Sequence, residues 1–189
     1  MPQPSPQDVS WPQGTIFTVG HSTLPIESFT ALLETYAIRK LCDVRTVPRS
    51  RHNPQFNADV LGSSLAAVGI DYIPMPELGG LRHPRKDSPN AGWRNKSFRG
   101  YADYMQTDAF NDAVDHLVEI GRNARTAIMC AEAVPWRCHR SLVADALNVR
   151  QVPVVEILSG TSYRDHKLTP FARTDGAHIT YPPEQPNLL

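Results

Sequence analysis

The sequence predicts one α/β domain with a mostly parallel sheet of about five strands, covered by helices on both faces in three layers. Short apolar runs rich in β-branched residues alternate along the chain with stretches that have apolar residues at helical spacing. This alternation is typical of parallel strands joined by crossover helices. The length of 189 residues also suits one domain with a sizeable core.

Five segments are predicted to be strands. Each is a short run in which apolar and β-branched residues predominate, as expected of strands buried in a sheet. The predicted strands are Thr15 to Val19, Leu41 to Val44, Ile70 to Ile73, Thr126 to Cys130 and Val152 to Leu158.

Four helices are predicted between the strands, and Thr23 and Asn57 are expected to cap the first two. The segment Leu78 to Gly100 is rich in glycine, proline and basic residues and is predicted to be a long loop. Long loops in compact domains are usually functional or disordered. The predicted helices begin at or near Pro25, Asn57, Thr107 or Asp108, and Cys138.

Both ends of the chain are rich in proline. The 17 prolines in the sequence are about twice the usual share of roughly 5%. We therefore expect flexible tails at residues 1–14 and 181–189, around a single domain at residues 15–180. The chain beyond the last predicted strand is expected to be irregular.

Composition argues against export and against a membrane protein. The sequence has no run of about 18 apolar residues and no signal peptide at its start. Its three cysteines, Cys42, Cys130 and Cys138, cannot all pair within one chain. They are therefore expected to be reduced thiols of a cytoplasmic protein without a membrane partner.

Basic residues are gathered in two segments although the formal net charge is zero. These segments are Val44 to Ala58 and Leu78 to Gly100, and local positive charge of this kind favours a small anionic ligand. Trp93 and Phe98 lie among the basic residues of the second segment, so a nucleic-acid-binding module is a further hypothesis. The zero net charge makes this hypothesis less favoured.

Reactive or charged residues follow four of the predicted strands. In open α/β sheets, ligands bind beyond the carboxyl ends of the strands. We therefore expect these residues to converge at one edge of the sheet. They are His21 and Ser22, Asp43 and Arg45, Glu77 in the segment that continues to Gly79 and Gly80, and Cys130 and Glu132.

Cys138 is predicted to be the centre of this site together with Cys130. Cys138 is followed by His139 and lies at the amino end of a predicted helix, where free N–H groups and neighbouring cations favour a thiolate. A phosphatase-like loop needs an arginine at position 136, where the chain has Trp136. The Cys-x-x-Cys pattern of a thiol redox pair is absent. A buried and inert cysteine remains the alternative for both thiols.

Our first hypothesis is an enzyme with a cysteine nucleophile, acting on a small anionic substrate by thiol or sulfur transfer or by hydrolysis. Histidine would move protons, arginine would hold the anion, and Glu132 would orient a histidine or act as acid or base. The catalytic candidates are Cys130, Cys138, His139, Glu132 and His21. The substrate-binding candidates are Ser22, Asp43, Arg45, Arg49, Arg51, Gly79, Gly80 and Arg140.

The second hypothesis is a zinc or iron site. Cys130, Cys138 and His139 are the candidate ligands, and Glu132 or His21 would complete the set. Thiolate and imidazole ligands suit zinc, and a site with three protein ligands keeps a position open for catalysis.

The motifs TVGHST, DVRTVPRSRHNPQFN, ELGG and MCAEAVPWRCHR, in this order, resemble the domain-of-unknown-function family 488 (DUF 488). The resemblance covers Thr15 to Leu158. It implies a widespread bacterial and archaeal cytosolic α/β domain with a shared site, and it leaves the reaction open. The residues that match are Gly20, His21, Ser22, Asp43, Arg45, Pro48, Gly79, Gly80, Cys130, Glu132, Cys138, His139 and Arg140.

Overall fold

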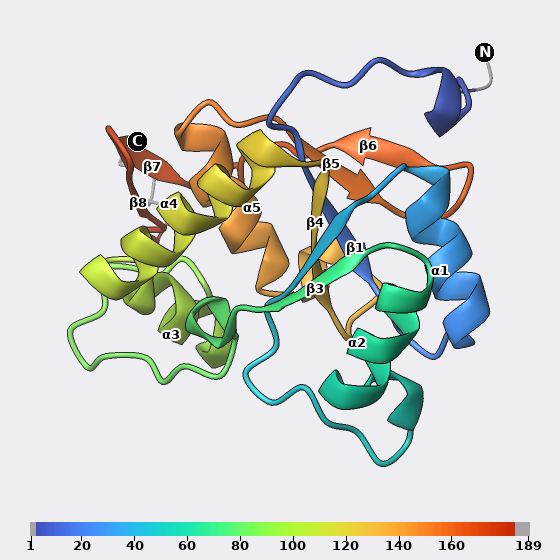
Figure 1. The fold of residues 1–189 in the computed structure, drawn as a ribbon. Coiled ribbons are helices and arrows are strands. Elements are labelled where there is room, and N and C mark those ends of the chain that lie inside the picture. Colours follow the sequence, from blue (N-terminus) through green and yellow to red (C-terminus); the bar gives the residue numbers. More distant parts are fainter. Residues whose placement is uncertain (1–2, 184–189) are drawn as a thin grey trace.

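The computed structural model describes residues 3–183, and its centre is a six-stranded sheet of order β3-β2-β4-β1-β5-β6 (Figure 1). All neighbouring pairs are parallel except β5 with β6. The predicted mostly parallel sheet is therefore confirmed, with one antiparallel edge strand added. The strands are β1 (Ile16–Gly20), β2 (Lys40–Asp43), β3 (Asp71–Pro74), β4 (Thr126–Cys130), β5 (Val154–Ile157) and β6 (Tyr163–Asp165).

The register of the sheet brings the ends of three strands level. Gly20 at the end of β1 lies beside Cys130 at the end of β4. On the other side of β4, Asp43 of β2 lies beside Met129. Residues that follow these three strands therefore meet at one edge of the sheet, where α/β domains bind their ligands.

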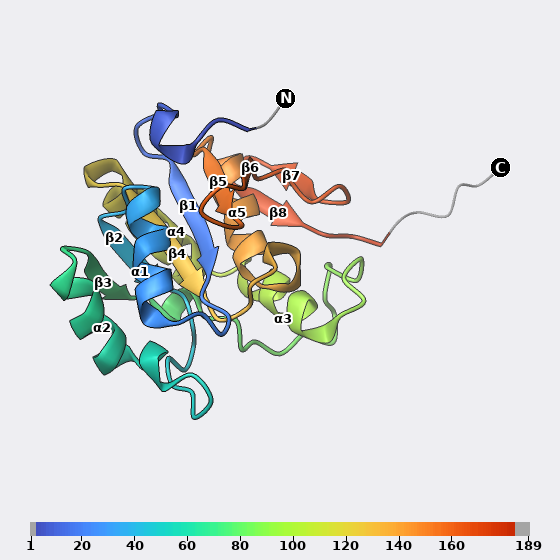
Figure 2. The same cartoon turned by 90° about the vertical axis from the view of Figure 1, so that its right-hand side faces the viewer.

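Five helices cover the two faces of the sheet and form the predicted three layers. Helices α1 and α2 lie on one face, and α3, α4 and α5 lie on the other (Figure 1, Figure 2). The helices are α1 (Ile26–Thr35), α2 (Ala58–Ala67), α3 (Lys96–Tyr104), α4 (Asp108–Asn123) and α5 (Arg140–Val149). Within residues 3–183, none of the helices is both long enough and apolar enough to cross a membrane.

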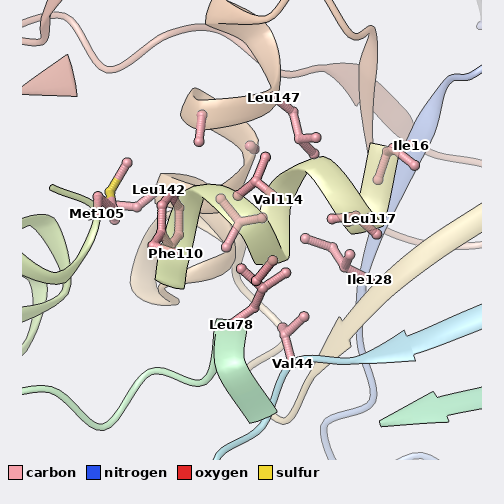
Figure 3. Packing of buried hydrophobic residues seen from close by; sticks show 14 of the residues in the cluster. Ile16, Val44, Leu78, Met105, Phe110, Val114, Leu117, Ile128, Leu142 and Leu147 are labelled. Atoms are coloured by element: carbon pink, nitrogen blue, oxygen red, sulfur yellow. The ribbon is translucent and has the colours of Figure 1, made fainter. Parts of the chain in front are cut away.

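The apolar core is built on both faces of β1. On the face covered by α4 and α5, Val114 and Leu117 pack with Ile16 and Ile128, and all four side chains are fully buried (Figure 3). Because side chains alternate along a strand, Phe17 points to the opposite face, beneath α1. Burial of each such side chain contributes about 1.5–3 kcal/mol, so β1 is stabilised from both sides.

The helix starts agree only partly with the predicted caps. Helix α4 begins at Asp108, one of the two predicted starts, and Thr107 before it accepts the backbone N–H of Phe110. The predicted cap at Thr23 is wrong, because Pro25 is the N-cap residue of α1 and provides no side-chain bond. Asn57 precedes α2, but its Oδ1 accepts the N–H of Ser50. It therefore closes the preceding loop instead of capping the helix.

The segment predicted to be a long loop, Leu78 to Gly100, contains the start of helix α3. Asn95 caps this helix by accepting the backbone N–H groups of Ser97 and Phe98. An asparagine followed by a short polar helix gives a weak sequence signal, because few apolar positions mark its buried face.

The chain beyond Leu158 is also more ordered than predicted. It forms the edge strand β6 and a separate hairpin of β7 (Arg173–Asp175) and β8 (His178–Thr180). These strands have three residues each and mostly exposed side chains. Such short strands carry too few alternating apolar positions to be recognised from the pattern alone.

Residues 1–2 and 184–189, at the far ends of the two predicted tails, lie outside the described residues. Within the described part, Trp11 packs edge-on against Phe17 with ring centroids 5.4 Å apart. Tyr181, the first residue of the other predicted tail, is fully buried. Tyr181 donates its hydroxyl to Asp145 of α5 at 2.8 Å, so Trp11 and Tyr181 both pack against the body of the domain. The division into one domain with two tails stays a prediction.

Candidate active site

A cleft of about 370 Å³ opens beyond the carboxyl ends of β2 and β4. It brings together several residues predicted for the site from distant parts of the chain. Those predicted residues are Arg45, Gly80, Cys130, Glu132, Cys138 and His139. The cleft is completed by Thr46, Val47, Leu81, Ser97, Phe98, Ala131 and Arg137.

Cys138 lies directly before helix α5, with only 4% of its surface exposed. His139 is the N-cap residue, and the carbonyl of Cys138 accepts the backbone N–H of Ser141 in the first turn. The amino end of a helix carries a partial positive charge that favours an anion. The structure thus places this thiol where the sequence predicts, in surroundings that favour a thiolate.

The imidazole of His139 is held in one orientation with one tautomer. Its Nε2 lies 2.9 Å from the carbonyl oxygen of Val44, which can only accept, so Nε2 must carry the proton. The lone pair of Nδ1 therefore faces Cys138, whose Sγ is 3.7 Å away. A Cβ atom on Gly80 would lie 2.5 Å from this Nδ1, so the ring position depends on glycine there.

Cys130 lies beside Cys138 at the end of β4. The Sγ atoms of the two cysteines and a ring nitrogen of His139 all lie within 4.8 Å of one another. The neighbouring Cys130 thiol is the largest cause of the lowered pKa of Cys138; burial opposes it, and His139 supports it. The neighbouring Cys138 sulfur and burial raise the pKa of Cys130. Once Cys138 has given up its proton, the pair is one thiolate and one thiol.

Arg140 is predicted from the sequence to bind the substrate, but its guanidinium contacts groups of the protein itself. It is fully buried and does not line the cleft. Its guanidinium donates to the carbonyl oxygens of Glu132 at 2.6 Å and Ala133 at 3.4 Å, and to Thr18 Oγ1 at 3.4 Å. These donors are used within the protein, so Arg140 fixes the loop between the two cysteines instead of holding a substrate. Its charge still favours the Cys138 thiolate.

The loop that follows Cys130 crosses directly over the end of β1. A Cβ atom on Gly20 would lie 2.0 Å from the carbonyl oxygen of Glu132. The backbone of this loop is therefore held between Gly20 and Arg140. The Glu132 side chain is exposed at the cleft, where its Oε1 accepts the backbone N–H of Val134 at 3.1 Å.

His21 and Arg45 belong to a buried network beside the cleft. Arg45 donates to both carboxylate oxygens of Asp43, at 2.8 and 2.5 Å, and the two side chains are 7% and 1% exposed. His21 Nδ1 donates to the Ser22 carbonyl at 2.8 Å, so its Nε2 is the acceptor of the 3.3 Å contact from Arg45. Burial is the main cause that lowers the pKa of His21 to about 4.

The general-base role predicted for His21 does not fit this arrangement. Its only lone pair is already directed at an arginine N–H, and its ring is stacked on Phe56 with centroids 4.0 Å apart. A base must be free to reach the proton that it removes. His21 is therefore a neutral residue that positions Arg45, and His139 is the histidine available to the cysteines.

The remaining predicted residues lie outside the cleft lining. Arg49 and Arg51 are exposed in the loop after β2. Ser22 is half-buried and donates its backbone N–H to the loop after β4. Gly79 packs closely under Thr46, since a Cβ atom there would lie 2.4 Å from the threonine Oγ1.

Sequence reasoning did not select Arg137, Ser97 or Phe98 as site residues. Arg137 is exposed at the cleft next to Cys138. Ser97 and Phe98 reach the cleft because helix α3 begins there. The capping asparagine, Asn95, is the one sequence signal that could have located this helix.

A second cluster of titratable groups was not recognised in the sequence. It lines a larger cleft of about 590 Å³ next to β5 and β6. His166 Nε2 lies 2.8 Å from Asp145 Oδ1, and Nδ1 lies 2.7 Å from Glu156 Oε1. Burial opposes the charged imidazolium, but the hydrogen bonds that it donates to these two carboxylates outweigh burial and raise the pKa of His166 to about 9. Arg164 also pairs with Glu156 at 2.5 Å.

Replacement of His166 by glutamine should remove a pH-dependent part of the stability. Because the pKa of His166 is higher in the folded state, its contribution is complete below the unfolded pKa of about 6.5 and is lost as the pH rises through about 9. A shift of this size corresponds to on the order of 3 kcal/mol. We expect the difference in free energy of unfolding between wild type and His166→Gln to shrink by that amount between these pH values, measured by urea denaturation.

The measurement must compare the free energies of unfolding of wild type and His166→Gln, because the contribution of Cys138 to stability changes with pH in the opposite direction. Its lowered pKa adds stability as the pH rises over the same range. This contribution is common to both proteins and cancels in the difference. A difference that stays constant with pH would contradict the charged state of His166.

The fold and the site together define an open α/β domain with a thiol–imidazole pair at the carboxyl ends of its strands. The chain belongs to the family described as Domain of unknown function DUF488, whose sequence profile matches residues 25–147. The matched region contains the whole cleft, while Gly20, His21 and Ser22 precede it. No curated protein and no solved structure matches the chain.

Proposed function

We propose that this protein is an enzyme that uses Cys138 as a nucleophile on a small anionic substrate, by thiol or sulfur transfer or by hydrolysis through a covalent intermediate. The observation that carries the proposal is the 3.7 Å contact between Cys138 Sγ and His139 Nδ1 at the wall of an open cleft. An activated thiol usually lies next to a base, and a third group holds that base in the right orientation. Here the orienting group is the carbonyl of Val44.

In this mechanism the imidazole of His139 moves one proton twice. Its Nδ1 first takes the proton of Cys138, and the Val44 carbonyl holds the ring in place through Nε2. The thiolate attacks the substrate, and the imidazolium then gives the proton to the leaving group. In the hydrolytic variant, the same nitrogen would activate the water that releases the covalent intermediate.

Arg137 is the cation best placed to attract an anionic substrate. It is exposed at the cleft, and within residues 3–183 its side chain has no carboxylate partner. Arg45 also lines the cleft, but its charge is balanced by Asp43. Arg49 and Arg51 lie outside the lining, so they would act on the approach of the substrate through longer-range attraction.

Alkylation by iodoacetamide tests the nucleophile without knowledge of the substrate. We expect one thiol of the wild-type protein to react rapidly at a pH well below the usual thiol pKa of about 8.5. Cys138→Ser should abolish this fast reaction, as followed by mass spectrometry across the pH range. Cys42→Ala is the matched control, because Cys42 is fully buried in β2 and should not contribute.

Two results would overturn the assignment. One is a fast reaction that survives in a folded Cys138→Ser protein. The other is a wild-type thiol that titrates near the usual value of about 8.5, which would mean that the surroundings of Cys138 do not activate it.

A metal site is the second candidate function, and one observation favours it. The sulfurs of Cys130 and Cys138 and a ring nitrogen of His139 lie within 4.8 Å of one another. The other ring nitrogen donates to a backbone carbonyl, an arrangement common among metal-binding histidines. These residues would supply three ligands to zinc or iron and leave one position open.

The alkylation experiment also distinguishes this candidate. If the site binds zinc, addition of zinc chloride should protect both thiols in stoichiometric amounts, and a chelator should restore their reaction. Unchanged alkylation in the presence of zinc would exclude zinc as the resident metal.

The nucleic-acid hypothesis stays the least favoured of the three. Trp93 and Phe98 pack on each other, with ring centroids 4.8 Å apart, and against the apolar core. Bases need accessible aromatic faces for stacking. The thiol chemistry itself fits the cytoplasm, where cysteines are kept reduced.

A further inference from the structure

The structure brings together two cysteines that the sequence keeps apart. Cys130 ends β4, and Cys138 precedes α5 on the other side of the loop formed by residues 131–137. Their sulfurs lie within 4.8 Å of each other at the wall of the cleft. The Cys-x-x-Cys pattern is therefore not needed to create a pair of adjacent thiols in this fold.

The two thiols differ in their surroundings. Only the Cys138 sulfur is in contact with the Nδ1 of His139, at 3.7 Å. Cys130 is half-buried and lines the cleft, and its sulfur lies within 4.8 Å of the Cys138 sulfur. Cys138 is thus equipped to attack a substrate, and Cys130 is placed to attack the Cys138 sulfur once that sulfur carries an adduct.

We propose that Cys130 resolves the covalent adduct of Cys138, so that the protein exchanges thiols with low-mass disulfides that carry carboxylate groups and cycles between a dithiol and a Cys130–Cys138 disulfide. This inference rests on the proposed role of Cys138 as the nucleophile. It narrows that function to thiol–disulfide exchange.

The reaction balances as follows for a disulfide R–S–S–R. The Cys138 thiolate attacks one sulfur, which forms the mixed disulfide Cys138–S–S–R and expels R–S⁻. The imidazolium of His139 protonates this thiolate, so its Nδ1 is free to accept the proton of Cys130. Cys130 then attacks the Cys138 sulfur and expels the second R–S⁻, which takes from Nδ1 the proton that came from Cys130. The two protein thiols lose two electrons, which reduce R–S–S–R to two thiols.

The geometry requires one local movement. A sulfur–sulfur bond is about 2.05 Å long, so the two sulfurs must approach each other. The loop of residues 131–137 is mostly exposed, and its backbone is held near Glu132 by Arg140 and Gly20. The Cys138 side of the loop lies beyond this anchor, so it can adjust without displacing β4.

The cleft favours a carboxylate-bearing disulfide over a neutral one. Its volume of about 370 Å³ admits one half of a low-mass disulfide, while the other half can remain in solvent. Arg137 is exposed beside Cys138 and supplies a cation for a carboxylate.

Oxidised glutathione is the probe that tests the inference. After incubation and quenching of free thiols, the wild-type protein should carry no adduct and should have lost the mass of two hydrogens. Cys130→Ser should accumulate a stable adduct of one glutathione, because the resolving thiol is gone. Cys138→Ser should gain no adduct, and Cys42→Ala should behave as the wild type.

Peptide mapping of the wild-type product should locate the bridge between Cys130 and Cys138. Cys130→Ala serves as a second variant, and circular dichroism confirms that each protein is folded. A wild-type protein that keeps one glutathione and forms no bridge would overturn the role of Cys130 as the resolving cysteine. If Cys138 still reacted rapidly with iodoacetamide, its proposed role as a nucleophile would stand. Slow alkylation together with no adduct in any variant would overturn both.

Discussion

Asp43→Asn is expected to lower the free energy of unfolding by about 3–5 kcal/mol, the usual cost of breaking a buried ion pair from one side. Asp43 receives two hydrogen bonds from the Arg45 side chain and one from the Tyr72 hydroxyl at 2.7 Å. The substitution leaves the guanidinium buried without its counter-charge. Urea denaturation of the two proteins at neutral pH measures the difference.

The surface pair of Arg85 and Asp87 provides a matched control. It has the same spacing in the sequence and the same two-bond geometry, with distances of 3.1 and 2.8 Å. Its side chains are 58% and 73% exposed, so Asp87→Asn should change stability far less than Asp43→Asn does, because water screens the exposed pair. Equal effects at the two positions would contradict the argument that desolvation makes the pair at Asp43 costly to break.

The Asp43 pair matters for the site as well as for stability. Arg45 lines the cleft and also donates to the carbonyl of Phe56 at 2.8 Å, which holds the loop after β2. The backbone carbonyl that orients His139 belongs to Val44, between the two paired residues. The ion pair therefore fixes the strand end from which the imidazole of His139 is positioned.

The strands and the edge where the site lies could be predicted because they depend on local signals. The run Thr126 to Cys130 is apolar for most of its length, so it is recognised as a buried strand before a cysteine. Parallel strands then place their carboxyl ends together, which is a general property of α/β sheets. The convergence of Cys130 with the residues after β2 follows from these two facts alone.

The roles of Arg140 and His21 could not be predicted in the same way. An arginine that holds a substrate and one that binds backbone carbonyls have the same side chain, and only the path of the loop decides between them. The carbonyls of Glu132 and Ala133 reach Arg140 because Gly20 lets that loop cross β1 closely. Such three-dimensional coincidences leave no periodic pattern.

The second titratable cluster was missed for a related reason. Asp145 is on helix α5, Glu156 is on β5, and His166 follows the edge strand β6. No two of these residues have a spacing that suggests a site. Their contact depends on a strand of three residues that the sequence does not reveal.

Gly80→Ala is expected to break the contact between the His139 ring and the Cys138 sulfur without replacing either residue. The added Cβ would lie 2.5 Å from Nδ1 and 2.8 Å from Cγ of the His139 ring, closer than atoms can approach. The ring must therefore move and lose its contact with the Cys138 sulfur. Because a nearby cation lowers an acidic pKa by about 1–3 units, we expect the pKa of Cys138 to rise by about one unit or more.

The pH dependence of iodoacetamide alkylation measures this change as an upward shift of the midpoint for the fast thiol. Gly62→Ala is the matched control, since a Cβ there meets Tyr72 at an ordinary 3.6 Å and lies inside helix α2. Alanine in a helix should stabilise that protein by about 0.5–1 kcal/mol without altering the thiol. If Gly80→Ala kept the wild-type midpoint in a folded protein, His139 would not be the group that activates Cys138, and the thiolate would depend on Cys130, the helix end and Arg140 instead.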